Sequence, residues 1–330
     1  MLEIIIITIA IALIFDFWNG VNDAANSIST VIATRVLPPM VAVGWAAWWN
    51  FAAAFGFGVS VAKTVGKGIV STTIIDEPMI LSALIGAIIL VAGASYLGLP
   101  VSASHSLIGG LIGAAIAKAG YSVLIYSGVM KVLIFIVLAP LIGMVVGFSV
   151  MILVTRISMR YKLKRNSVIF RRLQLVSAAA YSLGHGTNDA QKTMGIIAIL
   201  LFTGGYLGNT FYVPFWVIMA AHIAIGLGTL VGGRRVIKTL GMRVTKLKPI
   251  GGFSAETAGA VTLIGTALGG IPASTTHTIT GSIIGVGATK RLSSVRWGVA
   301  RRITWAWALT IPLSSTIAGL SYLAIKLFFL

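Results

Sequence analysis

The sequence contains no cysteine, and only seven of its 330 residues are acidic, against 25 lysines and arginines. Without cysteine the chain cannot form disulfides, thiolate metal sites or thiol redox centres. Charged residues are also scarce, at 10% of the chain, whereas 57% of it is hydrophobic. So few polar side chains cannot cover the surface of a water-soluble protein, which excludes a soluble helical domain.

What the sequence has instead is a series of long apolar runs. Runs of about 20 residues recur from one end to the other, and each is long enough to cross a hydrocarbon core of about 30 Å. We therefore predict an all-α polytopic protein of the cell membrane, with the lipid bilayer as its surroundings.

The net charge of +18 is unevenly distributed along the chain. Nineteen of the 25 basic residues fall in four intervals, which are Arg35, 156–172, 234–248 and 290–302. If ten segments cross the bilayer and the N-terminus lies outside, all four intervals lie on the cytoplasmic side. This is the positive-inside pattern, so the charge orients the protein and does not predict nucleic-acid binding.

Three motifs occur twice, in the same order and at nearly constant offset. They are Gly-x-Asn-Asp-Ala at 20–24 and 186–190, Lys-Thr-x-Gly at 63–66 and 238–241, and Gly-x-Pro-x-Ser-x-x-His at 98–105 and 270–277. Such self-similarity is typical of a duplicated structural unit. We therefore predict two repeats, over residues 1–155 and 173–330, joined by a basic cytoplasmic connector at 156–172.

Each repeat is predicted to contain about five membrane segments. Those of the first are 2–35, interrupted near 19–23, then 38–61, 77–97, 100–118 and 127–155. Those of the second are 173–203, interrupted near 185–189, then 211–232, 254–269, 272–288 and 303–329. An odd number of segments makes the repeats inverted, with broken helices and hairpin-like segments at the midplane, as in many secondary transporters.

The repeated Asn-Asp motif places acidic residues within apolar sequence. An ionised Asp at the centre of a membrane helix costs roughly 2.5–3.5 kcal/mol, so Asp23 and Asp189 need a cation or another partner. Asn26 shares a helical face with Asp23, and such oxygens suit Na⁺ or a relayed proton. Gln191 and Lys192 follow Asp189. The lysine is compatible with a bound anion or with neutralisation of Asp189, and the alternative for both aspartates is a purely structural cap.

The proline and hydroxyl motifs predict a different kind of site. Proline favours the first position of a helix, and hydroxyl residues cap its exposed N–H groups. A helix start of this kind binds anions, so two of them facing each other would hold a tetrahedral oxyanion. The alternative is that both are simply capped helix ends. The candidate ligands are Ser102, Ser104, Ser274, Thr275 and Thr276.

Three histidines accompany these motifs. His185 lies in the second Asn-Asp motif, where the first has Asn19, and is the strongest candidate for a functional role. His105 and His277 follow the helix starts, where they either orient the loop, carry protons or pack structurally. Two rival functions are an intramembrane hydrolase, using the aspartates or Ser104 with His105, and a passive anion channel. No Gly-x-Ser-x-Gly elbow supports the hydrolase.

The paired Gly-x-Asn-Asp-Ala and Pro-x-Ser-x-Ser/Thr-His motifs resemble those of the inorganic phosphate transporter (PiT) family, over essentially the whole chain. The resemblance implies a non-enzymatic symporter of inorganic phosphate coupled to Na⁺ or H⁺, without an organic cofactor, and makes a homodimer an expectation. It also makes Asn22 and Asn188 ligand candidates and Glu256 a polar residue important to transport. Ala103 replaces a serine of many members and Asn50 a glutamate of eukaryotic ones. Sulfate, which some members carry, is therefore an alternative substrate.

Overall fold

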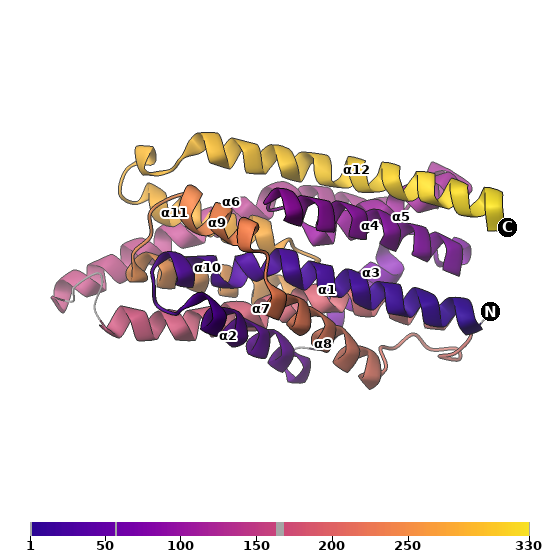
Figure 1. The fold of residues 1–330 in the computed structure, drawn as a ribbon, viewed down its shortest axis with the longest axis horizontal. Coiled ribbons are helices and arrows are strands. Elements are labelled where there is room, and N and C mark those ends of the chain that lie inside the picture. The colour runs from indigo at the N-terminus through magenta and orange to yellow at the C-terminus, as the bar shows by residue number, and fades with distance from the viewer. Residues whose placement is uncertain (1, 57, 163–167, 330) are drawn as a thin grey trace.

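The computed structural model describes residues 2–56, 58–162 and 168–329, and most of these residues are helical (Figure 1). The described α-helices are α1 (Leu2–Ala33), α2 (Pro39–Ala52), α3 (Ser60–Gly68), α4 (Glu77–Leu97), α5 (Ala103–Ala119), α6 (Tyr126–Arg160), α7 (Val168–Thr203), α8 (Phe215–Val231), α9 (Arg234–Arg243), α10 (Pro249–Leu268), α11 (Thr275–Ala288) and α12 (Trp297–Phe329). The prediction of an all-α protein is confirmed.

The order of the helices matches the three repeated motifs. The Asn-Asp motifs lie in α1 and α7, the Lys-Thr motifs in α3 and α9, and the proline motifs directly precede α5 and α11. Packing between the halves is reciprocal, because α5 packs on α12 and α11 packs on α6. In Figure 1, α1 runs from right to left and α7 from left to right. These features support the division into inverted repeats at 1–155 and 173–330, which stays a prediction. Residues 163–167 of the expected connector lie outside the described residues.

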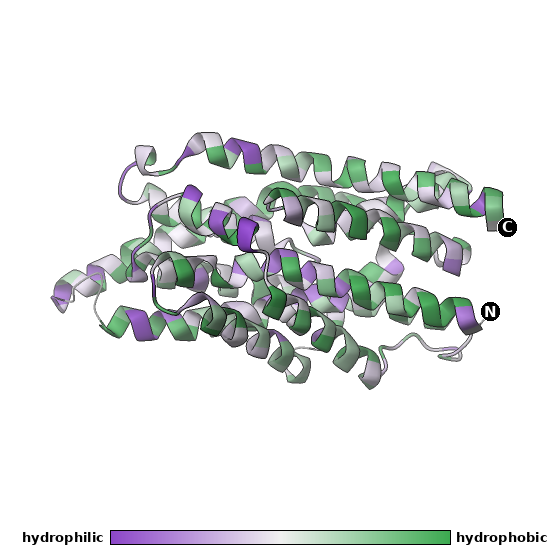
Figure 2. Cartoon of the chain, in the orientation of Figure 1, coloured by the Kyte–Doolittle hydropathy of each residue, from purple (hydrophilic) through white to green (hydrophobic). Residues whose placement is uncertain are grey.

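Four described helices are long and apolar enough to cross a membrane, namely α1, α4, α6 and α12, and bent pairs of helices raise the number to six. The α6 side chains Val137 and Val145 are about 60% exposed, as expected for a surface that faces lipid. Hydrophilic stretches gather toward the left end of the molecule in Figure 2, where α1 ends and α12 begins. The fold is that of a multi-pass membrane protein.

The other segments differ from the ten full crossings that we expected. Helices α5 and α11 are 17 and 14 residues long, and most of their side chains are buried by neighbouring helices. Helix α7 is long, but its centre carries the polar residues of the second Asn-Asp motif. The chain also forms a short helix that we did not predict. It is α9, which meets α8 at a bend of 72°.

The interruptions predicted near 19–23 and 185–189 are wrong, since α1 and α7 pass through both regions as continuous helices. The polar side chains there find partners on other helices, so the backbone keeps its own hydrogen bonds. The glycines of the motif permit close packing. A Cβ at Gly186 would come within 2.9 Å of the Cα of Asn50, and one at Gly20 within 3.1 Å of the Cα of Gly228.

Candidate functional site

The two hydroxyl-rich helix starts are capped as the sequence predicts. Ser102 is the N-cap of α5, and its side chain accepts a hydrogen bond from the backbone N–H of His105 at 3.2 Å. Ser274 caps α11 in the same way, accepting from His277 N–H at 3.3 Å. The prolines, however, do not occupy the first helical position. Pro100 and Pro272 lie two residues before the caps, because serine is the better N-cap and sets the first turn.

The two helix starts face each other at the centre of the molecule. Thr276 of α11 donates to the carbonyl of Val101 at 3.2 Å. The rings of His105 and His277 meet edge to face at 4.7 Å, and His277 also stacks on Trp307 at 3.9 Å. Both histidines therefore pack between the two helix starts, and their role stays a prediction.

Asp23 of α1 meets the start of α11. Its carboxylate accepts hydrogen bonds from Thr275 Oγ1 at 2.8 Å and Asn22 Nδ2 at 2.7 Å. Thr276 Oγ1 is 3.2 Å from the same carboxylate, as an alternative acceptor to Val101 O for its single hydrogen. Asn26, one turn further along α1, donates to Thr276 Oγ1 at 3.0 Å. The first Asn-Asp motif and the second helix start thus form one site, although they belong to different halves of the chain.

Asp189 of α7 lies beside the same threonine but has a cationic partner. Thr275 Oγ1 is 3.0 Å from Asp189 Oδ2, while Lys192 donates to the other carboxylate oxygen. Lys192 Nζ also donates to Ser104 Oγ and, at 3.0 Å, to the carbonyl of Ala273. All three ammonium hydrogens are therefore used. Lys192 therefore pairs with Asp189 in this structure, and its contact with a bound anion stays a prediction.

His185 lies between the two aspartates. Its Nε2 is 3.2 Å from Asp189 Oδ2 and 3.8 Å from Asp23 Oδ2, and its Nδ1 is 3.0 Å from Asn50 Oδ1. Asn50 Nδ2 donates to Thr229 at 2.9 Å, so its oxygen must accept from the histidine. Nδ1 therefore carries a proton, and Nε2 is the atom that faces the carboxylates. Asp23, His185 and Asp189 place one ligand atom each within 4.8 Å of one another, which suits a bound cation.

The remaining amide candidates have different positions. Asn22 donates to Val101 O at 3.1 Å and accepts from Ser95 at 3.1 Å, next to the first helix start. Asn188 is paired with Thr266 at 3.4 Å. Gln191, predicted to bind a cation, accepts hydrogen bonds at its Oε1 from the first backbone N–H groups of α3. The structure therefore does not bring Gln191 to the site, because it caps a helix that the sequence did not reveal.

Glu256 of α10 forms a separate polar cluster. It accepts hydrogen bonds from Thr30 at 2.6 Å, Gln174 at 2.9 Å and Ser177, all of them neutral donors. Thr30 follows Asp23 by seven residues, or about 10 Å along α1. Glu256 therefore lies between the central site and the basic end of the molecule, and its partners could not be predicted from spacing because they come from two other helices.

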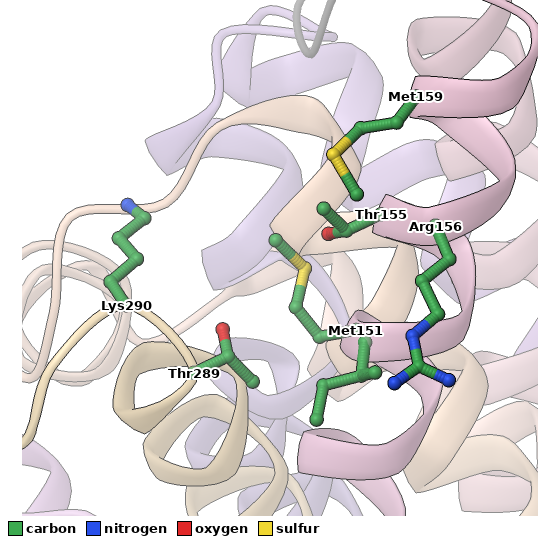
Figure 3. Close-up of a pocket in the computed structure, with 7 residues that line it drawn as sticks. Met151, Thr155, Arg156, Met159, Thr289 and Lys290 are labelled. Carbon is green, nitrogen blue, oxygen red and sulfur yellow. The ribbon is translucent and has the colours of Figure 1, made fainter.

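The central site is closed to both surfaces. Asp23, Asp189, Lys192 and the hydroxyl candidates are at most 3% exposed. A cavity of about 490 Å³ lies elsewhere, with Arg156 and other α6 side chains on one wall and Thr289 and Lys290 at the end of α11 on the other (Figure 3). The repeated Lys-Thr-x-Gly motif helps to keep the site closed. Thr239 donates to Gly98 O at 3.0 Å and Thr64 to Gly270 O at 2.8 Å.

These two hydrogen bonds are reciprocal. Each joins the Lys-Thr motif of one half to the turn before the helix start of the other half, and both turns need a glycine with positive φ, 70° at Gly98 and 63° at Gly270. Sequence comparison of the halves identified the motif but gave no reason for it. Ser95 was missed as a neighbour of the site, since it lies in no repeated motif, whereas Asn50 was named only as a departure from the family pattern.

Comparisons with known proteins agree with this geometry. The sequence pattern of the phosphate transporter family matches residues 19–318. A probable low-affinity inorganic phosphate transporter of Rhizobium meliloti is 52% identical, over 97% of this chain and 96% of its own length. A protein of the same description from Bacillus subtilis is 41% identical, over 100% and 99% of the two chains.

A solved structure, described as the sodium-dependent phosphate transporter, is 25% identical in sequence and superposes with a TM-score of 0.87, covering 99% of this chain and all of the other. These relatives are transporters and not enzymes, so the hydrolase alternative is excluded. The chain belongs to the phosphate transporter family.

Proposed function

We propose that this protein is a secondary transporter that carries inorganic phosphate into the cell together with Na⁺. Its similarity to low-affinity inorganic phosphate transporters supports phosphate as the substrate. Its similarity to a sodium-dependent phosphate transporter of solved structure supports Na⁺ over H⁺ as the coupling ion. A homodimer stays a prediction.

The observation that carries the proposal is the position of Thr275. Its hydroxyl has one hydrogen, yet it lies 2.8 Å from Asp23 and 3.0 Å from Asp189. Thr275 is also the first residue of α11, at a helix start suited to an anion. The cation-binding and anion-binding parts of the site therefore share one residue, so an ion bound at one part alters the other directly.

The charges of the site explain why an anion would need a cation. Asp23 and Asp189 carry two negative charges, and Lys192 supplies one positive charge. Adding phosphate to this buried cluster would increase its negative charge, at a cost of several kcal/mol for each unpaired ion. Na⁺ held by Asp23, Asn26 and Asp189 would offset that cost. The phosphate oxygens would then take hydrogen bonds from Ser102, Ser104, Ser274 and Thr276, and from Lys192 in place of its contacts with Ser104 and Ala273.

Release of phosphate on the other side requires one of the closed turns to open. The reciprocal hydrogen bonds from Thr64 and Thr239 lie on opposite sides of the site if the halves are inverted repeats. Breaking one bond at a time would expose the site alternately to the two faces of the membrane. The positive-inside pattern makes the face of Thr239, next to Arg235 and Arg243, the cytoplasmic one.

Uptake of radiolabelled phosphate into proteoliposomes tests the proposal. An inward Na⁺ gradient should drive accumulation, and choline with or without a pH gradient should not. Asp23→Asn should abolish the Na⁺-driven component. Asp76→Asn is a matched control, because Asp76 lies outside the site as the N-cap of α4 and asparagine is an equally good cap. Excess sulfate should not compete.

Three results would overturn the proposal in different ways. Uptake that only follows the phosphate gradient would indicate a channel. Accumulation driven by a pH gradient without Na⁺ would make the proton the coupling ion. Inhibition by sulfate as strong as that by unlabelled phosphate would make the site a general oxyanion site.

A further inference from the structure

A second group of buried oxygen atoms lies between α1 and α7, away from the central site. It consists of Asp16 and Asn19 on α1 and Thr193 on α7. All three side chains are at most 1% exposed. Asp16 Oδ2, Asn19 Oδ1 and Thr193 Oγ1 have no hydrogen-bond partner among the described residues. Thr193 faces the Asp16 carboxyl across the helix interface. A buried carboxyl group in this setting is either protonated or, when ionised, paired with a cation.

This group is distinct from the Asp23 site. Asp16 precedes Asp23 by seven residues, which places it on the same face of α1 and about 10 Å nearer the N-terminus. The Glu256 cluster lies a similar distance beyond Asp23 in the opposite direction, toward the basic end. Among the described residues, Lys118 pairs with Asp76 and Lys192 with Asp189, and no ion pair to Asp16 is seen.

The second half of the chain provides an internal comparison. The offset of 166 residues between the Asn-Asp motifs relates the group to a second set of residues, which are also buried. The related pairs are Asp16 and Ser182, Asn19 and His185, and Thr193 and Ser27. The second set has no carboxylate at the position of Asp16. Only the first set therefore carries a carboxyl group that, when ionised, would attract a cation.

We propose that Asp16, Asn19 and Thr193 form a separate binding site for Na⁺, on the side of Asp23 away from the basic end. Carboxylate, amide and hydroxyl oxygens are the ligands that hard cations prefer. Asn19 Nδ2 is 3.4 Å from Asp16 Oδ1. An amide flip would place Asn19 Oδ1 there instead. Two oxygens that bind one cation at about 2.4 Å and at right angles to each other are about 3.4 Å apart. The flipped Asn19 oxygen and Asp16 Oδ1 would have this separation.

The site has a specific part in the proposed function, on which this role rests. Na⁺ entering from the non-basic side reaches Asp16 about two helical turns before Asp23. A cation held there would reduce the charge of the closed site before phosphate binds, and its transfer to Asp23 would follow one face of α1. Because the halves differ at this position, a matching site on the basic side would not exist at Ser182.

Na⁺ binding is tested on the purified full-length protein without phosphate, so the test is independent of transport. The thermal unfolding midpoint is measured in NaCl and in choline chloride of equal concentration, for the wild type, Asp16→Asn, Thr193→Val and Asp23→Asn. If two sites bind Na⁺, each contributes a separate increase in Tm. Asp16→Asn and Asp23→Asn should then each remove about half of the increase in Tm. Thr193→Val should raise the Na⁺ concentration at which half of the increase is reached.

Ser182→Ala is the matched control and should keep the whole increase in Tm. In proteoliposomes, Asp16→Asn should raise the external Na⁺ concentration that gives half-maximal phosphate uptake by about tenfold, because one charged ligand is lost. A Na⁺ response that is unchanged in both Asp16→Asn and Thr193→Val, and lost only in Asp23→Asn, would refute the separate site and leave the proposed symport intact. The absence of any Na⁺-induced change in the wild type would also refute it.

Discussion

Removing the charge of Asp189 should destabilise the protein more than removing the charge of its partner Lys192. Asp189→Asn leaves a buried ammonium with only Ser104 Oγ and Ala273 O as partners. An uncompensated buried charge of this kind costs about 3–5 kcal/mol. Lys192→Met leaves the Asp189 carboxylate 3.2 Å from His185 Nε2. That contact compensates the charge when the imidazole is doubly protonated, so the second variant keeps a compensating partner that the first lacks.

The double variant Asp189→Asn with Lys192→Met should recover part of the loss, because it leaves neither charge unpaired. Thermal unfolding in detergent with choline chloride, followed by the fluorescence of the eight tryptophans, measures all four proteins. At roughly 2 °C per kcal/mol for a chain of this size, Asp189→Asn should lower Tm by about 6–10 °C. The double variant should be at least about 1 kcal/mol more stable than the sum of the single effects predicts.

Additive effects of the two substitutions would refute this interpretation of the pair, because a direct ion pair requires coupling between its members. An Asp189→Asn variant as stable as the wild type would show that Lys192 is not buried as an unpaired charge when Asp189 is neutral. The order of the two single variants is the more specific part of the prediction, since it depends on the contact between His185 and Asp189.

Two further predictions concern packing and the closed turns. Gly281→Ala should lower the free energy of unfolding by about 1–3 kcal/mol, because the added Cβ would meet the α6 backbone at Pro140. Gly265→Ala is the control, since no atom lies within 4 Å of its added Cβ, and it should leave stability unchanged. Thermal unfolding of the two variants measures the difference. In a protein that carries Val101→Cys, adding Thr239→Val should raise the rate of maleimide labelling about 2- to 10-fold, which corresponds to the loss of one hydrogen bond. Adding Thr64→Val instead should leave the labelling rate unchanged. The natural absence of cysteine makes this labelling specific.

The sequence predicted the elements of the site better than their contacts. The caps at Ser102 and Ser274 could be predicted because an N-cap depends on a few neighbouring residues. The pairing of Asp23 with Thr275 and Thr276 could only be expected in outline, from the inverted repeat, because these residues are about 250 positions apart. Local rules contain no information on which of the two helix starts each aspartate meets.

The predicted helix breaks show why composition alone misleads at such a site. Asn, Asp and Gly together are typical of turns when their polar groups have no other partner. In α1 and α7 the same residues serve side-chain contacts and close helix packing, so the backbone stays helical. Gln191 is a related case, because its oxygen caps α3, a short helix whose apolar residues are too few to be recognised as a membrane segment.

The differences between the two halves have a common physical consequence. At the offset of 166 residues, Asn26 of α1 corresponds to Lys192 of α7, and Asn19 corresponds to His185. Both replacements place a group able to carry positive charge next to Asp189. Asp23 accepts hydrogen bonds from the neutral donors Thr275 and Asn22 and lies farther from His185, at 3.8 Å against 3.2 Å for Asp189. In a fully symmetric site both carboxylates would need a mobile cation. Here Lys192 is a cation tethered to Asp189, so the demand for a mobile cation falls on Asp23, on the helix that also carries Asp16.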